Sequence, residues 1–333
     1  MEIPPGLIDS AAILRAQGTT DVVHREFRAG RLVRIRRGFY VPTADWLSAR
    51  PSERFAWSTA AVARSVKGAV LCGETAALAS GLPTLRTPAY VELATTLPGR
   101  SGVRRSPLMV LGEDATAQQV REKRSYPLKY CLKPTSETVV RGEFRCTSPA
   151  QTALDLMVSG RLSEALVVAD GLARMMHREG LLPADANLLA VPEIAAGISG
   201  HAHSAAQRRA EHVAALASPL AESAGESYSR AVFEFLGFEQ PVLQQVFRDA
   251  EGFIGRADCW WPQQRVVGEF DGKAKYTDAA LRGATSAEEA VYREKLREDR
   301  IRALGLGFVR WGWADVEKPE RLRRKLLAAG LRA

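Results

Sequence analysis

The chain has 333 residues, 46% of them hydrophobic, which is enough for two or three domains with buried cores. Its 46 Lys and Arg against 38 Asp and Glu leave a net charge of +8, so an acidic polymer is the expected partner, although charge alone does not separate DNA from RNA. No stretch approaches the roughly 18 apolar residues of a membrane span and the N-terminus lacks a secretory signal pattern, so we expect a cytoplasmic protein with no membrane partner.

The N-terminal residues predict a helix-turn-helix. Apolar residues recur at helical spacing over 7–16, and Gly18 and Thr19 break that pattern. Thr20 is a suitable N-cap for a second helix that runs to about Ala29. In a helix-turn-helix the second helix enters the major groove of DNA.

The segment that follows predicts a basic wing of two strands. Apolar residues alternate from Leu32 to Ile35 and again from Phe39 to Val41, with a turn between them. Basic wing residues would hold the phosphates beside the groove. The same pattern also suits a protein-interaction module, an alternative that stays open. We expect base contacts from Thr19, Thr20, His24 and Arg25, and further contacts, chiefly to phosphates, from Arg28, Arg34, Arg36 and Arg37.

Residues 5–80 resemble the N-terminal winged-helix domain of AbiEi-type antitoxins. The resemblance implies a protein that binds and represses its own promoter, with a cognate toxin as protein partner. Two later segments, 146–157 (CTSPAQTALDLM) and 165–175 (ALVVADGLARM), resemble the linker region of fusions between such regulators and nuclease domains.

The middle of the chain alternates helical and extended patterns without a chemical motif. Its composition places a connection rich in Ala, Gly, His and Ser at 196–220. The predicted elements are helices at 51–66 and 72–83, strands at 89–95 and 106–111, and two helices within 146–175 that start at Ser148-Pro149 and divide at Gly160.

The four cysteines have no Cys-x-x-Cys spacing, which argues against a zinc site and against a disulfide framework. We therefore expect buried thiols at Cys72, Cys131, Cys146 and Cys259.

An acidic hairpin is predicted in the last third of the chain. Residues 253–270 form two extended segments separated by a turn at Pro262 to Gln264. A hairpin centred there puts Asp258 opposite Glu269, with the side chains on one face roughly 5 Å apart, and Asp271 shares that face. Carboxylates crowded in this way are costly unless a cation or a proton neutralises them.

Carboxylate oxygens suit Mg²⁺ or Mn²⁺, and a metal held this way supports phosphodiester cleavage. It lowers the pKa of a bound water and offsets charge on the phosphate, to which Lys273 and Lys275 can add. The alternative is that Asp258 pairs with a neighbouring arginine and that Asp271 begins a turn.

A wider pattern surrounds this hairpin. Its segments are AESAGESYSR (221–230), PVLQQV (241–246), RADCWWP (256–262), GEFDGKAKY (268–276) and REKLREDRIRALGLGFVRWGWADV (293–316). Together they resemble the PD-(D/E)XK nuclease superfamily, and within it the group similar to very-short-patch-repair (Vsr) endonucleases. The resemblance implies that Glu226, Asp258 and Glu269 are catalytic metal ligands, and it puts Arg230 and Gln244 beside the nucleic acid.

Two positions depart from the superfamily pattern. The Glu-x-Lys motif requires a lysine where this chain has Asp271, and Ala257 replaces a proline. The role of the lysine then falls to Lys273, Lys275 or Arg297, or it is absent.

The helix expected at 287–303 mixes arginines with acids at helical spacing. That mixture is as typical of a solvated face with local ion pairs as of a phosphate contact. The resemblance brings one face of this helix near the acids, which makes Arg297 a candidate for binding phosphate. Trp311 and Trp313 suit packing better than base stacking.

These features predict an α+β multidomain protein. The expected domains are a winged helix-turn-helix at 1–80, an α/β region with a linker at 81–215 and a nuclease-like α/β domain at 216–333. The favoured function is DNA binding coupled to Mg²⁺-dependent phosphodiester cleavage, in phage defence or DNA processing.

The alternative is a non-enzymatic autorepressor and antitoxin of a type IV toxin-antitoxin pair. Its degenerate nuclease fold would serve DNA binding or homodimer formation. Three retained acids favour the enzyme, because clustered negative charge does not help a domain that only binds DNA. The missing lysine favours the regulator.

Overall fold

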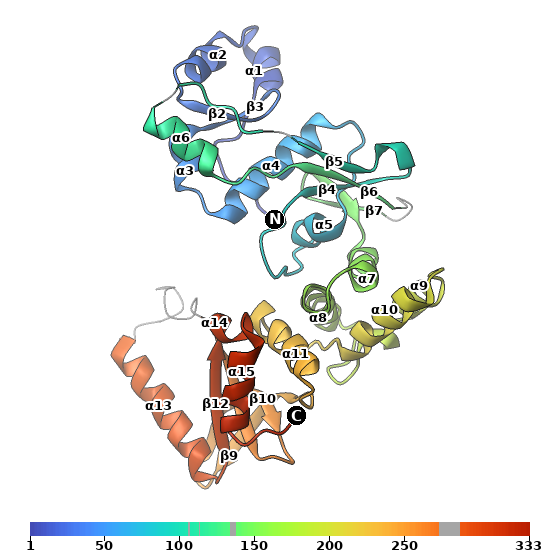
Figure 1. Cartoon of the computed structure of the whole chain (residues 1–333), viewed down its shortest axis with the longest axis vertical. Coiled ribbons are helices and arrows are strands. Elements are labelled where there is room, and N and C mark those ends of the chain that lie inside the picture. The colour runs from blue at the N-terminus through green and yellow to red at the C-terminus, as the bar shows by residue number, and fades with distance from the viewer. Residues whose placement is uncertain (106, 113, 134–137, 273–286) are drawn as a thin grey trace. The chain divides into compact units, whose positions relative to one another are not determined.

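The computed structural model describes residues 1–105, 107–112, 114–133, 138–272 and 287–333, with the backbone alone for 287, 288, 290 and 291. The chain divides into two compact units, Met1–Leu156 and Met157–Ala333. The boundary lies within helix α7 (Pro149–Ser159), so the boundaries expected at 80 and 215 fall inside the units. Helices alternate with small sheets throughout the described chain, which confirms the mixed α and β character (Figure 1).

Over its described residues, the first unit contains three small sheets and the helices that cover them. Its elements before α7 are β1 (Ile8–Asp9), α1 (Ser10–Gln17), α2 (Asp21–Arg28), β2 (Leu32–Arg36), β3 (Phe39–Pro42), α3 (Thr43–Ser48), α4 (Pro51–Ser65), α5 (Gly73–Ala79), β4 (Val91–Thr95), η1 (Pro98–Arg100), β5 (Gly102–Arg104), α6 (Ala115–Glu122), β6 (Leu128–Leu132), β7 (Thr138–Arg141) and β8 (Phe144–Thr147).

The N-terminal sheet has the order β1-β3-β2 and is antiparallel, with Val33 paired to Val41. Alternation sends Leu32 and Tyr40 to one face, where they pack with Val23 and Phe27 of α2. The other face packs on a cluster of side chains from the helices that follow, among them Trp46 and Trp57 of α3 and α4. The hairpin β2–β3 is thus anchored on both sides.

Helix α1 begins later than its apolar pattern predicts. The expected helix at 7–16 starts at Ser10 instead, because Ile8 and Asp9 pair with β3 as strand β1. The Asp9 carboxylate caps the helix by accepting hydrogen bonds from the backbone N–H groups of Ala11 and Ala12.

The remaining sheets of this unit are β4-β6-β5 and the hairpin β7-β8. The helices expected at 51–66 and 72–83 and the strand expected at 89–95 correspond to α4, α5 and β4. The strand predicted at 106–111 is wrong over its described residues. There Met109 makes a single bridge to Arg34, and the flanking residues are not in a strand.

The second unit combines a helical layer with a four-stranded sheet. Its elements after α7 are α8 (Leu162–Arg178), η2 (Leu188–Ala190), α9 (Pro192–Ser199), α10 (Ser204–Leu216), α11 (Ala224–Leu236), β9 (Val242–Asp249), β10 (Gly252–Trp261), β11 (Val266–Asp271), α13 (Ala287–Ala303), β12 (Gly307–Gly312), α14 (Trp313–Val316) and α15 (Pro319–Ala328).

The connection predicted at 196–220 is largely helical. Its Ala-rich composition forms α10, which buries Ala210, Val213 and Ala214. The composition alone does not predict this helix, because alanines on its buried face give little contrast in hydrophobicity with the exposed face.

The four-stranded sheet has the order β12-β11-β10-β9. Strands β9, β10 and β11 form an antiparallel meander, and α13 crosses over to return β12 parallel to β11. The predicted hairpin is confirmed, since Cys259 pairs with Gly268 across a turn at residues 262–265. Helices α11, α14 and α15 cover one face of the sheet, and α13 covers the other (Figure 1).

Close packing between α11 and the sheet depends on glycines. A Cβ on Gly225 would lie 2.0 Å from the Phe270 ring, and a Cβ on Gly268 would lie 2.7 Å from the Trp311 ring. Trp311 is 1% exposed, and its indole N–H donates to Ser229 Oγ at 2.7 Å. The prediction that Trp311 is a packing residue is confirmed.

Candidate functional site

The exposed face of α2 carries the residues expected to contact bases. Val23 and Phe27 point into the core, which leaves His24, Arg25 and Arg28 on the exposed side. Helix α2 starts one residue after Thr20, as predicted. The Thr20 side chain makes no cap bond in the structure.

The cap of α2 is supplied by the preceding residue. Thr19 Oγ1 accepts a hydrogen bond from the Asp21 backbone N–H at 3.1 Å. Thr19 is exposed and Thr20 half-buried.

The arginines of the hairpin are not equally available. Arg37 is exposed at the turn, beside Gly38 with its φ of +84°. Arg34 is half-buried, and its guanidinium lies 5.5 Å from the Phe27 ring centroid and contacts the Met109 sulfur. Arg36 donates to Ser65 Oγ, and burial lowers its pKa. Of the predicted phosphate ligands in the hairpin, Arg37 is therefore the most accessible.

Formal charge is divided unevenly between the two units. The first unit contains 22 Lys and Arg against 14 Asp and Glu, and the second contains 24 against 24. The entire excess of +8 therefore belongs to Met1–Leu156. The balance of the whole chain hides this division, which becomes visible only once the unit boundary is known.

In the second unit, Glu226 lies in the first turn of α11 and is 6% exposed. Its carboxylate accepts the Glu222 backbone N–H at 2.9 Å and the Ser223 hydroxyl at 2.7 Å. Burial raises the pKa of Glu226, and the nearby Asp258 carboxylate raises it further.

Asp258 occupies the fork at the end of the β10–β11 ladder. The paired register runs from Trp261 to Cys259 on β10. One residue further, Asp258 Oδ2 accepts the Phe270 backbone N–H at 3.0 Å. Where the two strands separate, the Asp258 carboxylate therefore replaces a backbone carbonyl as the acceptor for a backbone N–H of β11.

Glu269 is held by two arginines. The guanidinium of Arg297 on α13 lies 2.5 Å from Glu269 Oε1, and that of Arg310 on β12 lies 3.3 Å from Oε2. Glu294 contacts both arginines as well. Burial raises the pKa of Glu269, and the two arginines oppose that rise.

The positions of these acids bear on the metal site predicted at Glu226, Asp258 and Glu269. Among the described residues no group of three or more His, Cys, Asp or Glu is placed to hold a metal ion. The Asp258 carboxylate raises the pKa of Glu226 through charge repulsion, whereas both oxygens of Glu269 face arginines. Asp271 is half-buried at the end of β11, and Lys273 and Lys275 lie outside the described residues.

Gln244 shows an unusual backbone conformation beside this pair. Its φ is +55° within β9, and its side-chain amide donates to Glu226 Oε2 at 3.2 Å. A left-handed residue other than glycine or asparagine is costly and persists only where its surroundings enforce it. The amide therefore holds Glu226, and the contact of Gln244 with nucleic acid stays a prediction.

Arg230 is placed differently from the prediction. It is 5% exposed and donates to both oxygens of Asp170, which is fully buried on α8, at 2.8 and 2.9 Å. Burial raises the pKa of Asp170, and the arginine opposes that rise. The prediction that Arg230 contacts nucleic acid is wrong, because its guanidinium is buried and bonded to Asp170 inside the unit.

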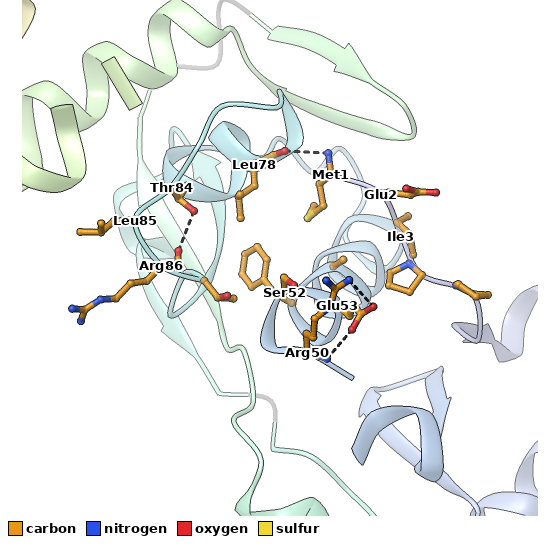
Figure 2. A pocket seen from close by; sticks show the side chains of 15 residues that line it. Met1, Glu2, Ile3, Arg50, Ser52, Glu53, Leu78, Thr84, Leu85 and Arg86 are labelled. Carbon is orange, nitrogen blue, oxygen red and sulfur yellow. Dashed lines mark hydrogen bonds and ion pairs between the residues drawn. The ribbon is translucent and has the colours of Figure 1, made fainter. Parts of the chain in front are cut away.

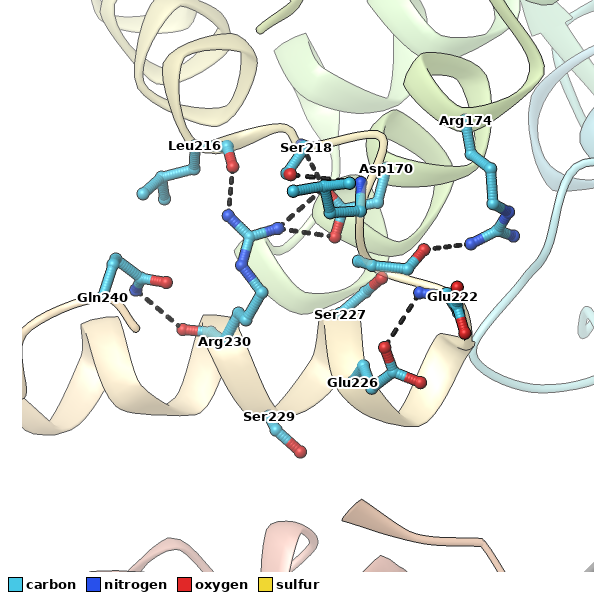
Figure 3. A network of polar contacts seen from close by, with 12 residues as sticks. Asp170, Arg174, Leu216, Ser218, Glu222, Glu226, Ser227, Ser229, Arg230 and Gln240 are labelled. Atoms are coloured by element: carbon cyan, nitrogen blue, oxygen red, sulfur yellow. Dashed lines mark hydrogen bonds and ion pairs between the residues drawn. The ribbon is translucent and has the colours of Figure 1, made fainter. Parts of the chain in front are cut away.

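The Asp170–Arg230 pair belongs to a network that holds the segment before α11 (Figure 3). Asp170 also accepts the Ser218 backbone N–H at 2.8 Å, and Arg174 donates to the Ala221 carbonyl. The start of α11, and with it Glu226, is thereby tied to α8. Asp170 was missed by the sequence analysis, although a single acid inside the apolar run VVADGLA is a signal for a buried ion pair.

A cavity of about 650 Å³ lies in the first unit, away from α2 (Figure 2). The N-terminal segment, α4 and the loop after α5 line it, with Ile3, Phe55 and Leu78 among the apolar residues. At its wall Arg50 Nη2 lies 3.1 Å from Glu53 Oε1. The sequence carried no motif for this cavity.

No family model, curated protein or solved structure matches the chain. Within the described ranges, none of the helices combines the length and the apolarity needed to cross a membrane.

Proposed function

We propose that this chain is a DNA-binding protein and that its first unit makes the contact. The observation that carries the proposal is the confinement of the +8 excess to Met1–Leu156. Phosphate neutralisation by Lys and Arg supplies most of the non-specific affinity for DNA.

Part of this positive charge is exposed on one helix and on the turn beside it. Arg25 and Arg28 extend from the exposed side of α2, and Arg37 extends from the adjoining turn. A helix presented beside a basic hairpin suits a major groove with phosphates at its edges. Autorepression of a promoter and neutralisation of a toxin, as in the AbiEi-type antitoxins, are compatible with this mode of binding.

The test is fluorescence anisotropy of the full-length protein with a labelled DNA duplex and, separately, a labelled RNA of the same sequence. Arg28→Ala should weaken duplex binding at every sequence tried and reduce the salt slope by about 1. Arg323→Ala, an exposed arginine of α15, is the matched control and should leave binding unchanged. Equal losses for both variants would contradict the proposal, and preference for RNA would redirect it.

A second candidate function is metal-dependent phosphodiester cleavage in the second unit. It is favoured by one observation, the buried Glu226 carboxylate, whose pKa the Asp258 charge raises and which accepts a hydrogen bond from the strained Gln244. A bound Mg²⁺ or Mn²⁺ would supply a water of lowered pKa. In that setting Glu226 and Asp258 hold the cation, and Gln244 orients Glu226.

The order of elements in this unit, a helix, three meandering strands, a crossover helix and a fourth parallel strand, is compatible with a PD-(D/E)XK-type domain. Glu269 does not fit as a third ligand while Arg297 and Arg310 hold it. For this reason cleavage takes second place to DNA binding.

Nicking of supercoiled plasmid with Mg²⁺ or Mn²⁺ tests the second candidate. Cutting should disappear in Asp258→Ala and persist in Glu251→Ala, which removes an acid that is 81% exposed. If the wild-type protein binds DNA but does not cut it, the nuclease hypothesis is wrong and the hypothesis of a non-enzymatic regulator remains.

A further inference from the structure

The cavity in the first unit is built from three segments (Figure 2). They are the N-terminal residues 1–5, the first turns of α4, and α5 with the loop after it. More than half of the lining residues are apolar, and among them Phe55 is 1% exposed, with its ring centroid 5.3 Å from that of Tyr126. Small-molecule sites are concave, mostly apolar spaces of about 300–1,000 Å³. This cavity of about 650 Å³ lies within that range.

The charges around the cavity favour an uncharged ligand. Arg50 Nη2 lies 3.1 Å from Glu53 Oε1, and Glu53 Oε2 accepts the Arg50 backbone N–H at 2.7 Å, so these two charges neutralise each other. The other charged side chains of the lining, Glu2 and Arg86, are exposed and of opposite sign. Burial of an ion without a partner is costly, which disfavours an ionic ligand against the apolar walls.

Two hydroxyl groups can bind the polar end of such a ligand. Ser52 is the second residue of α4 and is exposed, and Thr87 is half-buried in the loop after α5. Neither hydroxyl has a hydrogen-bond partner among the described residues, whereas the Thr84 hydroxyl donates to the Arg86 carbonyl at 3.0 Å. The cavity therefore suits an uncharged molecule with an aliphatic or aromatic body and one hydroxyl, carbonyl or amine group.

The N-terminal segment that lines the cavity is loosely packed. A second cavity, of about 380 Å³, is lined by Met1 and Ile3 together with Ala79 and residues 141–144 of the β7–β8 hairpin. Because Met1 and Ile3 line both cavities, the segment lacks on two sides the close packing that is normal in protein interiors. A ligand in the larger cavity supplies contacts that are missing there.

The same segment is connected to the helix-turn-helix. The Trp57 indole N–H donates to the Pro4 carbonyl at 2.9 Å, and Trp57 packs in one core cluster with Val41 of β3. Further along the chain, Ile8 pairs with Tyr40 as part of β1, which leads directly into α1. A change in the position of residues 1–5 therefore reaches the sheet and the first helix of the helix-turn-helix through these contacts.

We propose that this cavity is an effector site for a small, uncharged, apolar molecule, and that its occupation raises the affinity of the first unit for DNA. The ligand binds the conformation in which β1 is paired and Asp9 caps α1. The proposed DNA contact uses the same conformation, so a ligand that favours it also favours DNA binding. By linkage, DNA raises the affinity for the ligand by the same factor. The effect on DNA rests on the proposed function, whereas the site does not.

Fluorescence of N-phenylnaphthylamine with the full-length protein tests the site. This uncharged aromatic amine emits strongly only in apolar surroundings, so its fluorescence should rise on binding and fall when decanol displaces it. Decanoate has the same chain length with a carboxylate and should displace the probe at least about tenfold less well. Equal or better displacement by decanoate would overturn the assignment of an uncharged ligand.

Variants that fill the cavity locate the probe. Ser52→Trp places an indole at the cavity and should abolish probe binding. Ser204→Trp, at an exposed serine in the first turn of α10, is the matched control and should bind the probe like wild type. Thr87→Phe fills the cavity from the loop after α5 and decides the question if Ser52→Trp does not fold. Equal binding by the cavity variants and the control would overturn the proposal.

Fluorescence anisotropy of a labelled duplex measures the effect on DNA. Saturating decanol should tighten binding by the wild-type protein at least about fivefold and should leave binding by Ser52→Trp unchanged. Unchanged or weaker wild-type binding in decanol would overturn the coupling. A protein that binds the probe as described but binds no DNA would contradict the proposed function alone, and one that binds DNA but not the probe would contradict the site alone.

Discussion

The two units of the chain use arginine in opposite ways. In the first unit, Arg25, Arg28 and Arg37 are exposed, and basic residues outnumber acids. In the second unit, Arg230 and Arg297 are enclosed with the acids Asp170 and Glu269, and the charges balance. Exposed excess charge attracts an outside polyanion, whereas enclosed paired charge fixes internal structure. The same residue type therefore indicates binding in one unit and architecture in the other.

The Asp170–Arg230 pair offers the largest test of this contrast. Asp170→Ala leaves a buried guanidinium without its partner, which should lower the free energy of unfolding by about 3–5 kcal/mol. Urea denaturation followed by circular dichroism measures the loss. Arg256→Ala is the control, because its pair with Glu222 is 48% exposed on both sides and should contribute less than about 1 kcal/mol. A small loss for Asp170→Ala would show that the buried pair is not structural.

The arginine pair around Glu269 should have an intermediate effect. Arg297→Met keeps the length of the side chain but removes one of the two cations that neutralise Glu269, at a cost of about 1–3 kcal/mol. The pKa of Glu269 should rise further, because Arg297 lowers it in the intact protein. NMR titration of the Glu269 carboxyl carbon measures that change.

Arg293→Met on the same helix is the control for this variant. Arg293 pairs with Glu289 in an exposed (i, i+4) contact, which should contribute roughly 0.2–0.5 kcal/mol. Equal losses for the two methionine variants would mean that Glu269 is stabilised from elsewhere.

Glu226 predicts a dependence on pH in a known direction. Its pKa is raised in the folded state by burial and by Asp258, so folding stabilises the protonated form. The contribution of this group to stability is therefore complete below its unfolded pKa of about 4.3 and is lost as the pH rises through the raised folded value. Glu226→Gln should be more stable than wild type at neutral pH, with the difference vanishing in acid.

Thermal unfolding from pH 4 to pH 8 measures this effect. Glu251→Gln is the control. The Glu251 side chain is 81% exposed, so this variant should follow the wild-type curve. A Glu226→Gln curve parallel to wild type at every pH would show that the carboxylate is not destabilised in the fold.

Local patterns in the sequence predicted much of the fold. The turn at Pro262, the division of α7 from α8 at Gly160 and the start of α2 after Thr20 depend on neighbouring residues, and all agree with the structure. The predicted elements were wrong where contacts between distant residues determine the local structure. Ile8 joins a strand because β3 offers a partner. The apolar residues near Met109 make one bridge without a complete strand.

The candidate sites show the same limit. The pairing of Cys259 with Gly268 follows from hairpin register, which the sequence contains. The partners of Arg230 and Glu269 do not follow from it, because Asp170 lies 60 positions away from Arg230 and Arg310 approaches from a parallel strand. Sequence identifies residues able to carry charge, and the fold determines whether that charge is neutralised.

The salt dependence of DNA binding tests the contrast between the units most directly. We would compare the full-length triple variant Arg25→Ala, Arg28→Ala, Arg37→Ala with a matched triple in the second unit, Lys318→Ala, Arg323→Ala, Arg324→Ala, all six positions being exposed. The account predicts that the first triple flattens the plot of log affinity against log salt by up to about 3, since each phosphate contact contributes about 1, while the second leaves it unchanged. Flattening by the second triple, or an unchanged slope for the first, would contradict it.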